Sequence, residues 1–382
     1  MMRISCVACL FAGALAGFGA TRALPIGDPE RGYDLFQNRK CIACHSIAGE
    51  GGKTAPDLAR QVDRAFNPYV LAGLMWNHAP SMWAALERAR MPKPELSAQD
   101  AADLFVYLFS AGALESPPDD GRGREVYQAK KCGACHNSGS ALLANSTPAR
   151  GRLAVQDRAE LAQRSWNRSG EMRAALEKAS IAYPQLTAIE FADLAAFLRT
   201  VAGPPQPGRV APTPEPSKSG GSLYAQKGCA RCHRGALNQE GRPTRFNVNE
   251  FAAAMWNHPF RTRRDGTRLG SDEMRSLVNY LVSIQFTKES GNPDRGEKVF
   301  AGKGCSRCHD SPSSGAPPRS SMAGRMTSYD VVAALWRHGP EMVRRIRQSN
   351  TSWPHFRDAE MADVAAYLHR LEFKRRRTLK SP

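Results

Sequence analysis

A chain of 382 residues is too long for one small domain and is long enough for two to four domains. Hydrophobic residues make up 42% of it, so it can bury cores, and its formal net charge of +17 favours anionic partners or anionic groups. No nucleic-acid-binding motif and no interleaving of basic with aromatic residues accompanies this charge, which argues against nucleic-acid binding.

The first 23 residues have the features of a secretory signal peptide. A basic start at Arg3 is followed by an apolar run over residues 4–20 and by small residues that predict cleavage after Ala23. No later run approaches the roughly 20 apolar residues of a membrane span. We therefore expect a periplasmic or otherwise extracytoplasmic protein whose mature chain has no transmembrane span. An uncleaved N-terminal anchor is the alternative.

Eight of the ten cysteines lie in four Cys-x-x-Cys-His motifs, and the other two lie in the predicted signal peptide. Two cysteines at this spacing can form two thioethers to one haem, and the histidine that follows can bind the haem iron. The predicted attachment residues are Cys41, Cys44, Cys132, Cys135, Cys229, Cys232, Cys305 and Cys308. The predicted proximal iron ligands are His45, His136, His233 and His309. The motifs therefore predict four covalently bound haem c groups as cofactors.

A longer repeat surrounds each motif. A glycine stands nine residues before the first cysteine, and an aromatic residue stands five before it, so the two share one face of a predicted helix. These positions are Gly32, Gly123, Gly220 and Gly296 for the glycine, and Phe36, Tyr127, Tyr224 and Phe300 for the aromatic residue. Each unit ends in a helical pattern, at residues 101–108, 191–198, 274–281 and 361–368. We expect the first helix of each unit to cross its last helix at the glycine.

Each unit resembles a class I c-type cytochrome domain, and the resemblance covers essentially all of the mature chain. It implies an all-α fold of four tandem helical domains, each around one covalent haem. The expected boundaries are residues 1–23 for the signal peptide, 24–116 for unit 1, 117–203 for unit 2, 204–221 for a proline-rich linker, 222–287 for unit 3, 288–373 for unit 4 and 374–382 for a basic tail. Since the linker interrupts the repeat, we predict two pairs of sequence neighbours, unit 1 with unit 2 and unit 3 with unit 4.

Two further positions recur in every unit. A proline follows each motif, at Pro56, Pro148, Pro243 and Pro317 or Pro318. In the cytochrome family that the units resemble, the carbonyl group at such a proline accepts a hydrogen bond from the proximal histidine. A tryptophan then appears at Trp76, Trp166, Trp256 and Trp336. We expect it to pack at the haem edge, with its N–H on a propionate or on a backbone carbonyl.

The distal ligands follow from positions counted from that tryptophan. Six residues after it stand Met82, Met172 and Met342, in units 1, 2 and 4, and two residues after it stand His78, His258 and His338, in units 1, 3 and 4. Unit 2 can use only Met172 from this set and unit 3 only His258. For units 1 and 4 we choose Met82 and Met342, with His78 and His338 as alternatives and Met91 as a rival in unit 1. A thioether ligand raises the reduction potential, so haem 3 is expected to differ from the others.

The leading functional hypothesis is a periplasmic electron-transfer protein rather than an enzyme. Its partners would be a redox donor and acceptor, including a membrane-associated oxidoreductase complex to which the chain belongs. One alternative is a haem enzyme or gas sensor with an open coordination site at haem 3. Another is a Cys-x-x-Cys redox or zinc protein, which would leave the four adjacent histidines unexplained.

Overall fold

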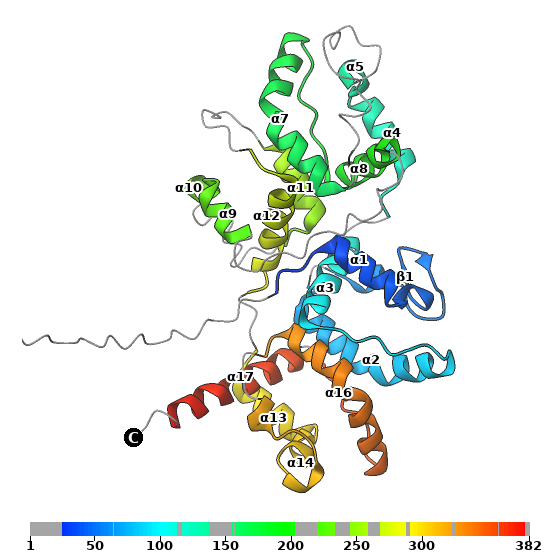
Figure 1. The fold of residues 1–382 in the computed structure, drawn as a ribbon, viewed down its shortest axis with the longest axis vertical. Coiled ribbons are helices and arrows are strands. Elements are labelled where there is room, and N and C mark those ends of the chain that lie inside the picture. Colours follow the sequence, from blue (N-terminus) through cyan, green and yellow to red (C-terminus); the bar gives the residue numbers. More distant parts are fainter. Residues whose placement is uncertain are drawn as a thin grey trace, which may run out of the picture.

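The computed structural model describes residues 25–63, 65–112, 117–136, 155, 157–202, 220–233, 245–258, 268–287, 291–322, 326–357 and 359–378. In this part of the chain the fold is all-α, as expected (Figure 1). Its strands are β1 (Ser46–Ile47) and β2 (Glu50–Gly51), which pair antiparallel with Ser46 opposite Gly51. The predicted signal peptide and proline-rich linker lie outside the described residues, apart from Gly220 and Gly221 at the linker's end.

Units 1 and 2 each have a first helix, a short turn of helix at the cysteine motif, a long third helix and a last helix. In unit 1 these are α1 (Pro29–Asn38), the 3-10 turn η1 (Cys41–Ala43), α2 (Pro68–Arg88) and α3 (Ala98–Gly112), with a second 3-10 turn η2 (Ala59–Gln61). In unit 2 they are α4 (Asp120–Ala129), α5 (Gly133–His136), α7 (Arg158–Lys178) and α8 (Ala188–Ala202).

Units 3 and 4 repeat this order. Unit 3 has α9 (Gly220–Gln226), α10 (Cys229–Cys232), α11 (Val248–Asn257) and α12 (Ser271–Ile284). Unit 4 has α13 (Pro293–Gly302), α14 (Cys305–His309), η4 (Pro312–Ser314), α15 (Arg319–Met322), α16 (Ser328–Gln348) and α17 (Glu360–Thr378). Because α17 continues to Thr378, part of the predicted basic tail extends the last helix.

The predicted crossing of first and last helix is confirmed in every unit. A Cβ atom added to Gly32, Gly123 or Gly296 would collide with a backbone carbonyl of the last helix, and one added to Gly220 would collide with Tyr280 and Ser276. Next to the crossing, two aromatic rings meet with centroids 5.5–6.4 Å apart. These ring pairs are Phe36–Tyr107, Tyr127–Phe197, Tyr224–Tyr280 and Phe300–Tyr367. Glycine therefore permits the close approach that the aromatic pair then fills.

At three of these crossings, an ion pair that was not predicted from the sequence joins the first helix to the last helix. The residue before the crossing glycine is an arginine, and its guanidinium donates to both oxygens of an aspartate on the last helix at 2.6–3.0 Å. The pairs are Arg31–Asp103, Arg122–Asp193 and Arg295–Asp363. Each aspartate also accepts a backbone N–H at the start of the first helix. In the sequence, these ion pairs are indicated by an Arg-Gly dipeptide in the first helix and an Ala-Asp dipeptide in the last helix of units 1, 2 and 4. Unit 3 has Ser219 in place of the arginine and Ser276 in place of the aspartate.

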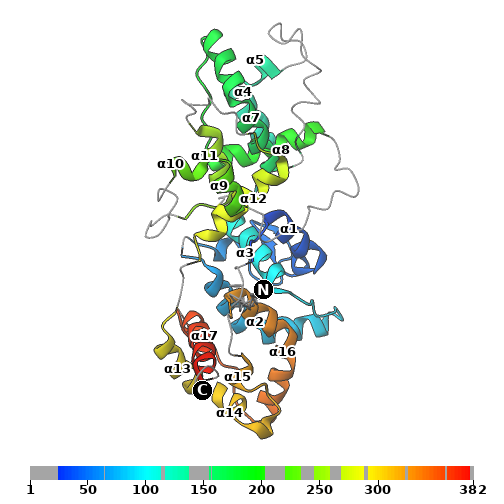
Figure 2. The ribbon, with the colours of Figure 1, turned by 60° about the vertical axis from the view of Figure 1, so that its left-hand side comes forward.

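Domain pairing differs from the sequence-based prediction. Helix α2 of unit 1 packs against α16 and α17 of unit 4, and α16 packs against α3 of unit 1. Helix α7 of unit 2 packs against α11 and α12 of unit 3, and α11 packs against α8 of unit 2. Figures 1 and 2 show the resulting two lobes, with blue and orange helices together in one and green and yellow helices in the other. Unit 1 therefore pairs with unit 4, and unit 2 with unit 3.

The third helix connects the partners in each pair through a Trp-Asn dipeptide. Trp76 donates its indole N–H to Pro354 O at 2.8 Å, and Trp256 donates to Pro184 O at 2.8 Å. The asparagine that follows exchanges two hydrogen bonds of 2.7–3.0 Å with the backbone of one residue in the partner unit. These exchanges are Asn77 with Phe356, Asn167 with Leu269 and Asn257 with Leu186. Unit 4 has the exposed Arg337 at this position.

Aromatic packing accompanies these hydrogen bonds in the pair of units 1 and 4. The rings of Trp76 and Trp353 stack with centroids 5.0 Å apart, and Trp83 meets Trp336 edge to face at 6.0 Å. A Cβ atom at Gly339 would collide with the Trp83 ring, so glycine lets α2 and α16 cross closely. Buried aromatic pairs contribute about 0.5–1.5 kcal/mol beyond their area. The interface is therefore packed like a domain core.

We predict that Asn257→Ala lowers the free energy of unfolding by about 1–3 kcal/mol, because it leaves the N–H and C=O groups of the buried Leu186 without these partners. Thermal or denaturant unfolding of the full-length protein measures the change. Arg337→Ala is the matched control, since it occupies the same repeat position but is exposed, and it should stay within about 0.5 kcal/mol of the wild type. Equal effects of the two substitutions would contradict the role of the asparagine.

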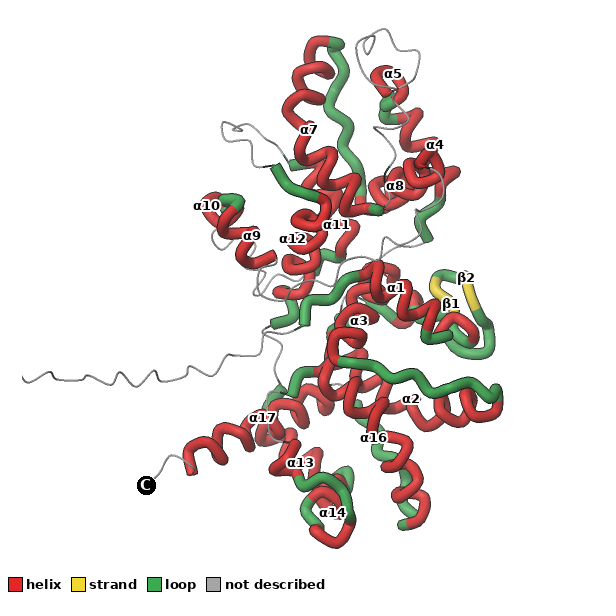
Figure 3. Tube along the Cα trace, viewed as in Figure 1, coloured by secondary structure: helices red, strands yellow, loops and turns green. Residues whose placement is uncertain are grey.

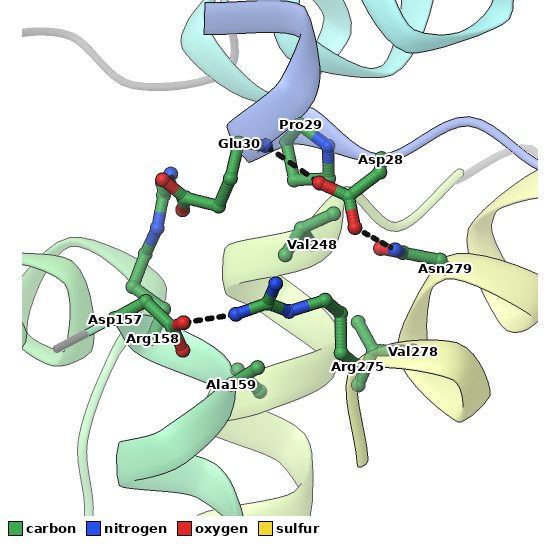
Figure 4. Close-up of a pocket in the computed structure, with 11 residues that line it drawn as sticks. Asp28, Pro29, Glu30, Asp157, Arg158, Ala159, Val248, Arg275, Val278 and Asn279 are labelled. Carbon is green, nitrogen blue, oxygen red and sulfur yellow. Dashed lines mark hydrogen bonds and ion pairs between the residues drawn. The ribbon is translucent and has the colours of Figure 1, made fainter. Parts of the chain in front are cut away.

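A buried polar cluster joins the two lobes where units 1, 2 and 3 meet (Figure 4). Asn279 donates to Asp28 at 2.8 Å, Arg158 pairs with Glu30 at 3.0 Å, and Arg275 pairs with Asp157. Burial tends to raise the pKa of Glu30, but the charges of Arg158, Arg199 and Arg275 and the hydrogen bond from Arg158 together lower it, so Glu30 stays ionised. The cavity among these side chains has a volume of about 20 Å³, room for no more than a water molecule. The cluster therefore connects the two lobes and does not form a substrate-binding site.

Candidate haem sites

All four cysteine motifs begin after the same backbone feature. The residue before the first cysteine has a left-handed conformation, with φ between 59° and 79°. These residues are Lys40, Lys131, Gly228 and Gly304. The left-handed residue ends the first helix and turns the chain into the short helical segment that carries both cysteines. The same local backbone conformation therefore precedes the cysteine-bearing segment in each unit.

The proximal histidines of units 1 and 4 have the predicted proline partners. Nδ1 of His45 lies 2.9 Å from Pro56 O, and Nδ1 of His309 lies 2.8 Å from Pro317 O. A ring N–H that donates to these carbonyls fixes the tautomer and leaves the lone pair of Nε2 available for a metal. The proline prediction is confirmed at these two sites, whereas Pro148 and Pro243 lie outside the described residues.

Units 2 and 3 share a different contact at the same histidine. Tyr127 donates its hydroxyl to His136 O, and Tyr224 donates to His233 O, both at 3.1 Å. Units 1 and 4 have Phe36 and Phe300 at the tyrosine position, so they lack this bond. The units that pair in space therefore also resemble each other here, which is a signal of the pairing that the sequence reasoning missed.

The first cysteines of three motifs do not have the environment of reactive or zinc-binding thiols. Burial raises the pKa of the Cys41, Cys132 and Cys305 thiols to about 11. Zinc binding and thiol exchange require the thiolate, which such pKa values disfavour. Among the described residues, no group of three or more His, Cys, Asp or Glu side chains could hold a metal ion. The half-buried cysteines, followed by a histidine with an available Nε2, fit a thioether-linked haem instead.

On the third helix, the residues two and six after the tryptophan lie on one face, four residues apart. In unit 2, burial lowers the pKa of His136, and the charge of Arg168 on this face of α7 lowers it further. Met172 lies one turn further along this face and is half-buried. In unit 1, Nδ1 of His78 lies 2.8 Å from Leu74 O of its own helix, and Met82 is half-buried on the same face.

Met91, the rival candidate in unit 1, lies where the chain reverses after α2. The residue before it, Arg90, has φ of 54°, and Ser180 and Asn350 repeat this conformation after α7 and α16. Figure 3 shows the segments after α2 and α7 running back along those helices. The Met91 N–H donates to Leu86 O at 2.9 Å, which closes the end of α2. Met274 and Met361, which occupy equivalent positions on the last helices of units 3 and 4, are buried core residues.

In unit 3, the rings of His233 and His258 have centroids 5.8 Å apart. His258 directly follows α11, which has 10 residues, whereas α2, α7 and α16 each run for 21 residues. Burial lowers the pKa of His258, and His233 and Arg173 lower it further. Its imidazole is therefore held in the neutral form, which is the form that binds a metal.

The recurring tryptophans have a different role from the one expected. Trp76 and Trp256 do donate to backbone carbonyls, but those carbonyls belong to the partner unit rather than to the haem edge of their own unit. Trp76 points away from the face that carries His78, because residues two apart on a helix lie about 200° apart. The third helix thus presents one face to its own haem site and the other to its partner unit.

Comparison with known proteins shows which family units 1 and 4 match. Residues 29–111 and 293–372 match the cytochrome c family. These stretches correspond to units 1 and 4, and cytochrome c domains imply a covalently bound haem c with its iron. The two cytochrome c regions carry the motifs at His45 and His309, whose geometry fits that cofactor. Units 1 and 4 thus have the all-α cytochrome c fold, and the described helices of units 2 and 3 follow the same order.

The chain is also similar to a curated protein that takes part in nitric oxide reduction. This relative is a nitric oxide reductase component from Stutzerimonas stutzeri, one of the subunits of that enzyme, with 36% identity over 83 residues. The match covers 20% of this chain and 54% of the relative, so the chain spans about half the length of the relative that it matches. No solved structure matches the chain significantly. Within the described residues, none of the helices is long and apolar enough to span a membrane.

Proposed function

We propose that the chain is a tetrahaem cytochrome c that passes single electrons between redox partners outside the cytoplasm. The observation that carries this proposal is the pair of Nδ1 hydrogen bonds at His45 and His309, which prepare both histidines to bind iron directly after a Cys-x-x-Cys pair. Bound haem supplies one-electron chemistry through its iron. The repeated backbone turn before Cys132 and Cys229 supports the same cofactor in units 2 and 3.

For the distal ligands we propose Met82, Met172, His258 and Met342. Met172 is the remaining candidate in unit 2, because Arg168 stands at the position of the histidine, and Met172 is half-buried on α7. The short distance between the His233 and His258 rings supports a second imidazole in unit 3. His78 and His338 stay open as alternatives in units 1 and 4. The protein's contribution is to hold each ligand and to exclude water from the iron.

The partner that we propose is a membrane-associated oxidoreductase complex. The similarity to a nitric oxide reductase component, which extends over 83 residues, supports a role in delivering electrons within or to such a complex. The predicted signal peptide supports an extracytoplasmic location. A haem enzyme or gas sensor with an open site at haem 3 would instead require His258 to stay away from the iron.

We predict that the purified protein contains four covalently attached haems, of which haem 3 has the lowest potential, because a second imidazole favours ferric iron relative to a thioether. Acid extraction of haem followed by spectroscopic counting tests the number. A potentiometric titration of the wild type and of Met172→His tests the ligands. Met172→His should lower the potential of one further haem and remove one methionine-ligation signal.

Four haems with one shared potential would contradict the assignment of His258. Fewer than four acid-resistant haems would contradict the proposed count. Binding of carbon monoxide to the reduced wild-type protein would favour the enzyme or sensor alternative, because six-coordinate haems resist added ligands.

A further inference from the structure

Helix α7 of unit 2 contacts unit 3 beside His258. The ring of Trp166 lies 6.0 Å from the His258 ring, measured between centroids. Seven residues along the same helix, the guanidinium of Arg173 is 3.5 Å from His258 O. Residues seven apart lie on one face of a helix, so a single face of α7 contacts both the ring and the backbone of His258.

Arg173 is itself held in place by unit 2. Its guanidinium stacks over the Tyr183 ring at 3.9 Å from the centroid, and the Tyr183 hydroxyl donates to Trp256 O at 3.2 Å. Trp256 in turn donates its N–H to Pro184 O. The C-terminal end of α11 is therefore fastened to unit 2 immediately before His258.

Helical geometry does not determine the direction in which the His258 side chain points. His258 is the residue that ends α11, with extended backbone angles of −57° and 124°, so the helix no longer sets its direction. Its ring faces His233 of unit 3 on one side and Trp166 of unit 2 on another. Contacts from the neighbouring unit thus lie where they can hold the ring toward His233.

We propose that helix α7 of unit 2 forms the distal wall of the haem site of unit 3, with Trp166 and Arg173 as positioning residues that hold His258 toward His233. This inference rests on the proposed function, because it takes His258 as the distal ligand. It assigns Trp166 a role in the site of another unit, where the sequence had suggested the haem edge of its own. It also makes the coordination of haem 3 dependent on the packing of unit 2 against unit 3.

The test uses the full-length holoprotein carrying Trp166→Ala with Arg173→Ala. Reduced protein is titrated with carbon monoxide, and the oxidised protein is examined by electron paramagnetic resonance. We expect the wild type to bind no carbon monoxide, and the double variant to bind one molecule per chain with the appearance of one high-spin ferric signal. His258→Ala provides the positive control, since it removes the proposed ligand directly.

Asn167→Ala is the matched negative control. Asn167 is the neighbour of Trp166 on α7, and its side chain bonds to the backbone of Leu269 in unit 3 at 2.8 and 3.0 Å. Its loss weakens the same interface without removing either positioning side chain. We expect this variant to exclude carbon monoxide as the wild type does, although it unfolds at a lower temperature.

Two outcomes overturn the inference, and a third overturns the proposed function on which it rests. The double variant could exclude carbon monoxide and retain the low-spin signal of haem 3, or Asn167→Ala could bind as much carbon monoxide as the double variant. Binding by the wild type would instead overturn the His258 assignment in the proposed function, which is a distinguishable failure. If the double variant does not fold with four haems, Trp166→Leu and Arg173→Gln, made singly, decide the question by the same titration.

Discussion

Cutting the chain within residues 204–219 is expected to leave its two halves firmly associated. The cut separates units 1 and 2 from units 3 and 4 along the sequence, but each half then holds one member of both spatial pairs. Trp83, Trp336 and Trp256 are buried at these interfaces, and the asparagine side chains of Asn77, Asn167 and Asn257 bridge them. A protease site introduced into this segment, followed by size-exclusion chromatography, measures the result.

The cut protein should elute at the position of the intact chain and should separate into fragments only in denaturant. If unit 1 paired with unit 2 and unit 3 with unit 4, the two halves of the cut chain would separate without denaturant. A cut chain that also carries Asn77→Ala and Asn257→Ala should separate at a lower denaturant concentration. Free halves in native buffer would show that the exchanged helices do not hold the molecule together.

Substitution of the crossing glycine in unit 4 is expected to be strongly destabilising, because an added Cβ at Gly296 would make the shortest contact of any described glycine. The Cβ of Gly296→Ala would overlap the carbonyl of Asp363 on α17, and backbone on both helices must move to accept it. Overpacking of this kind costs about 1–3 kcal/mol or more. We expect a lower unfolding temperature and poorer haem incorporation in unit 4, because the same crossing supports the segment with Cys305 and Cys308.

Gly302→Ala is the control on the same helix, α13. A Cβ at Gly302 meets nothing within 4 Å, so alanine should be neutral or should stabilise the helix by up to about 1 kcal/mol. Thermal unfolding and acid-resistant haem content of both variants measure the difference. A Gly296→Ala protein as stable and as fully loaded with haem as Gly302→Ala would contradict the close crossing.

Much of each unit could be predicted from the chain alone because the relevant contacts are local or repeat at a fixed offset. The crossing of Gly123 with the last helix, beside the rings of Tyr127 and Phe197, follows from spacing within one unit. The bond from His45 to Pro56 is what the resemblance to the cytochrome family implied. Local side-chain caps also begin the last helices, with Ser97 and Asp100 at α3, Thr187 and Glu190 at α8, and Glu273 accepting from the Gly270 N–H at α12.

The sequence by itself determined four attachment motifs, the all-α units around them and the candidate ligands on their third helices. Only the tertiary structure decided which units pair and what the tryptophans contact. The physical reason is that a helix such as α7 has two faces, and its sequence fixes the spacing of residues on each face but not which unit covers the outer one. That choice depends on the fit of Trp166 and Asn167 to surfaces far along the chain, at His258 and Leu269.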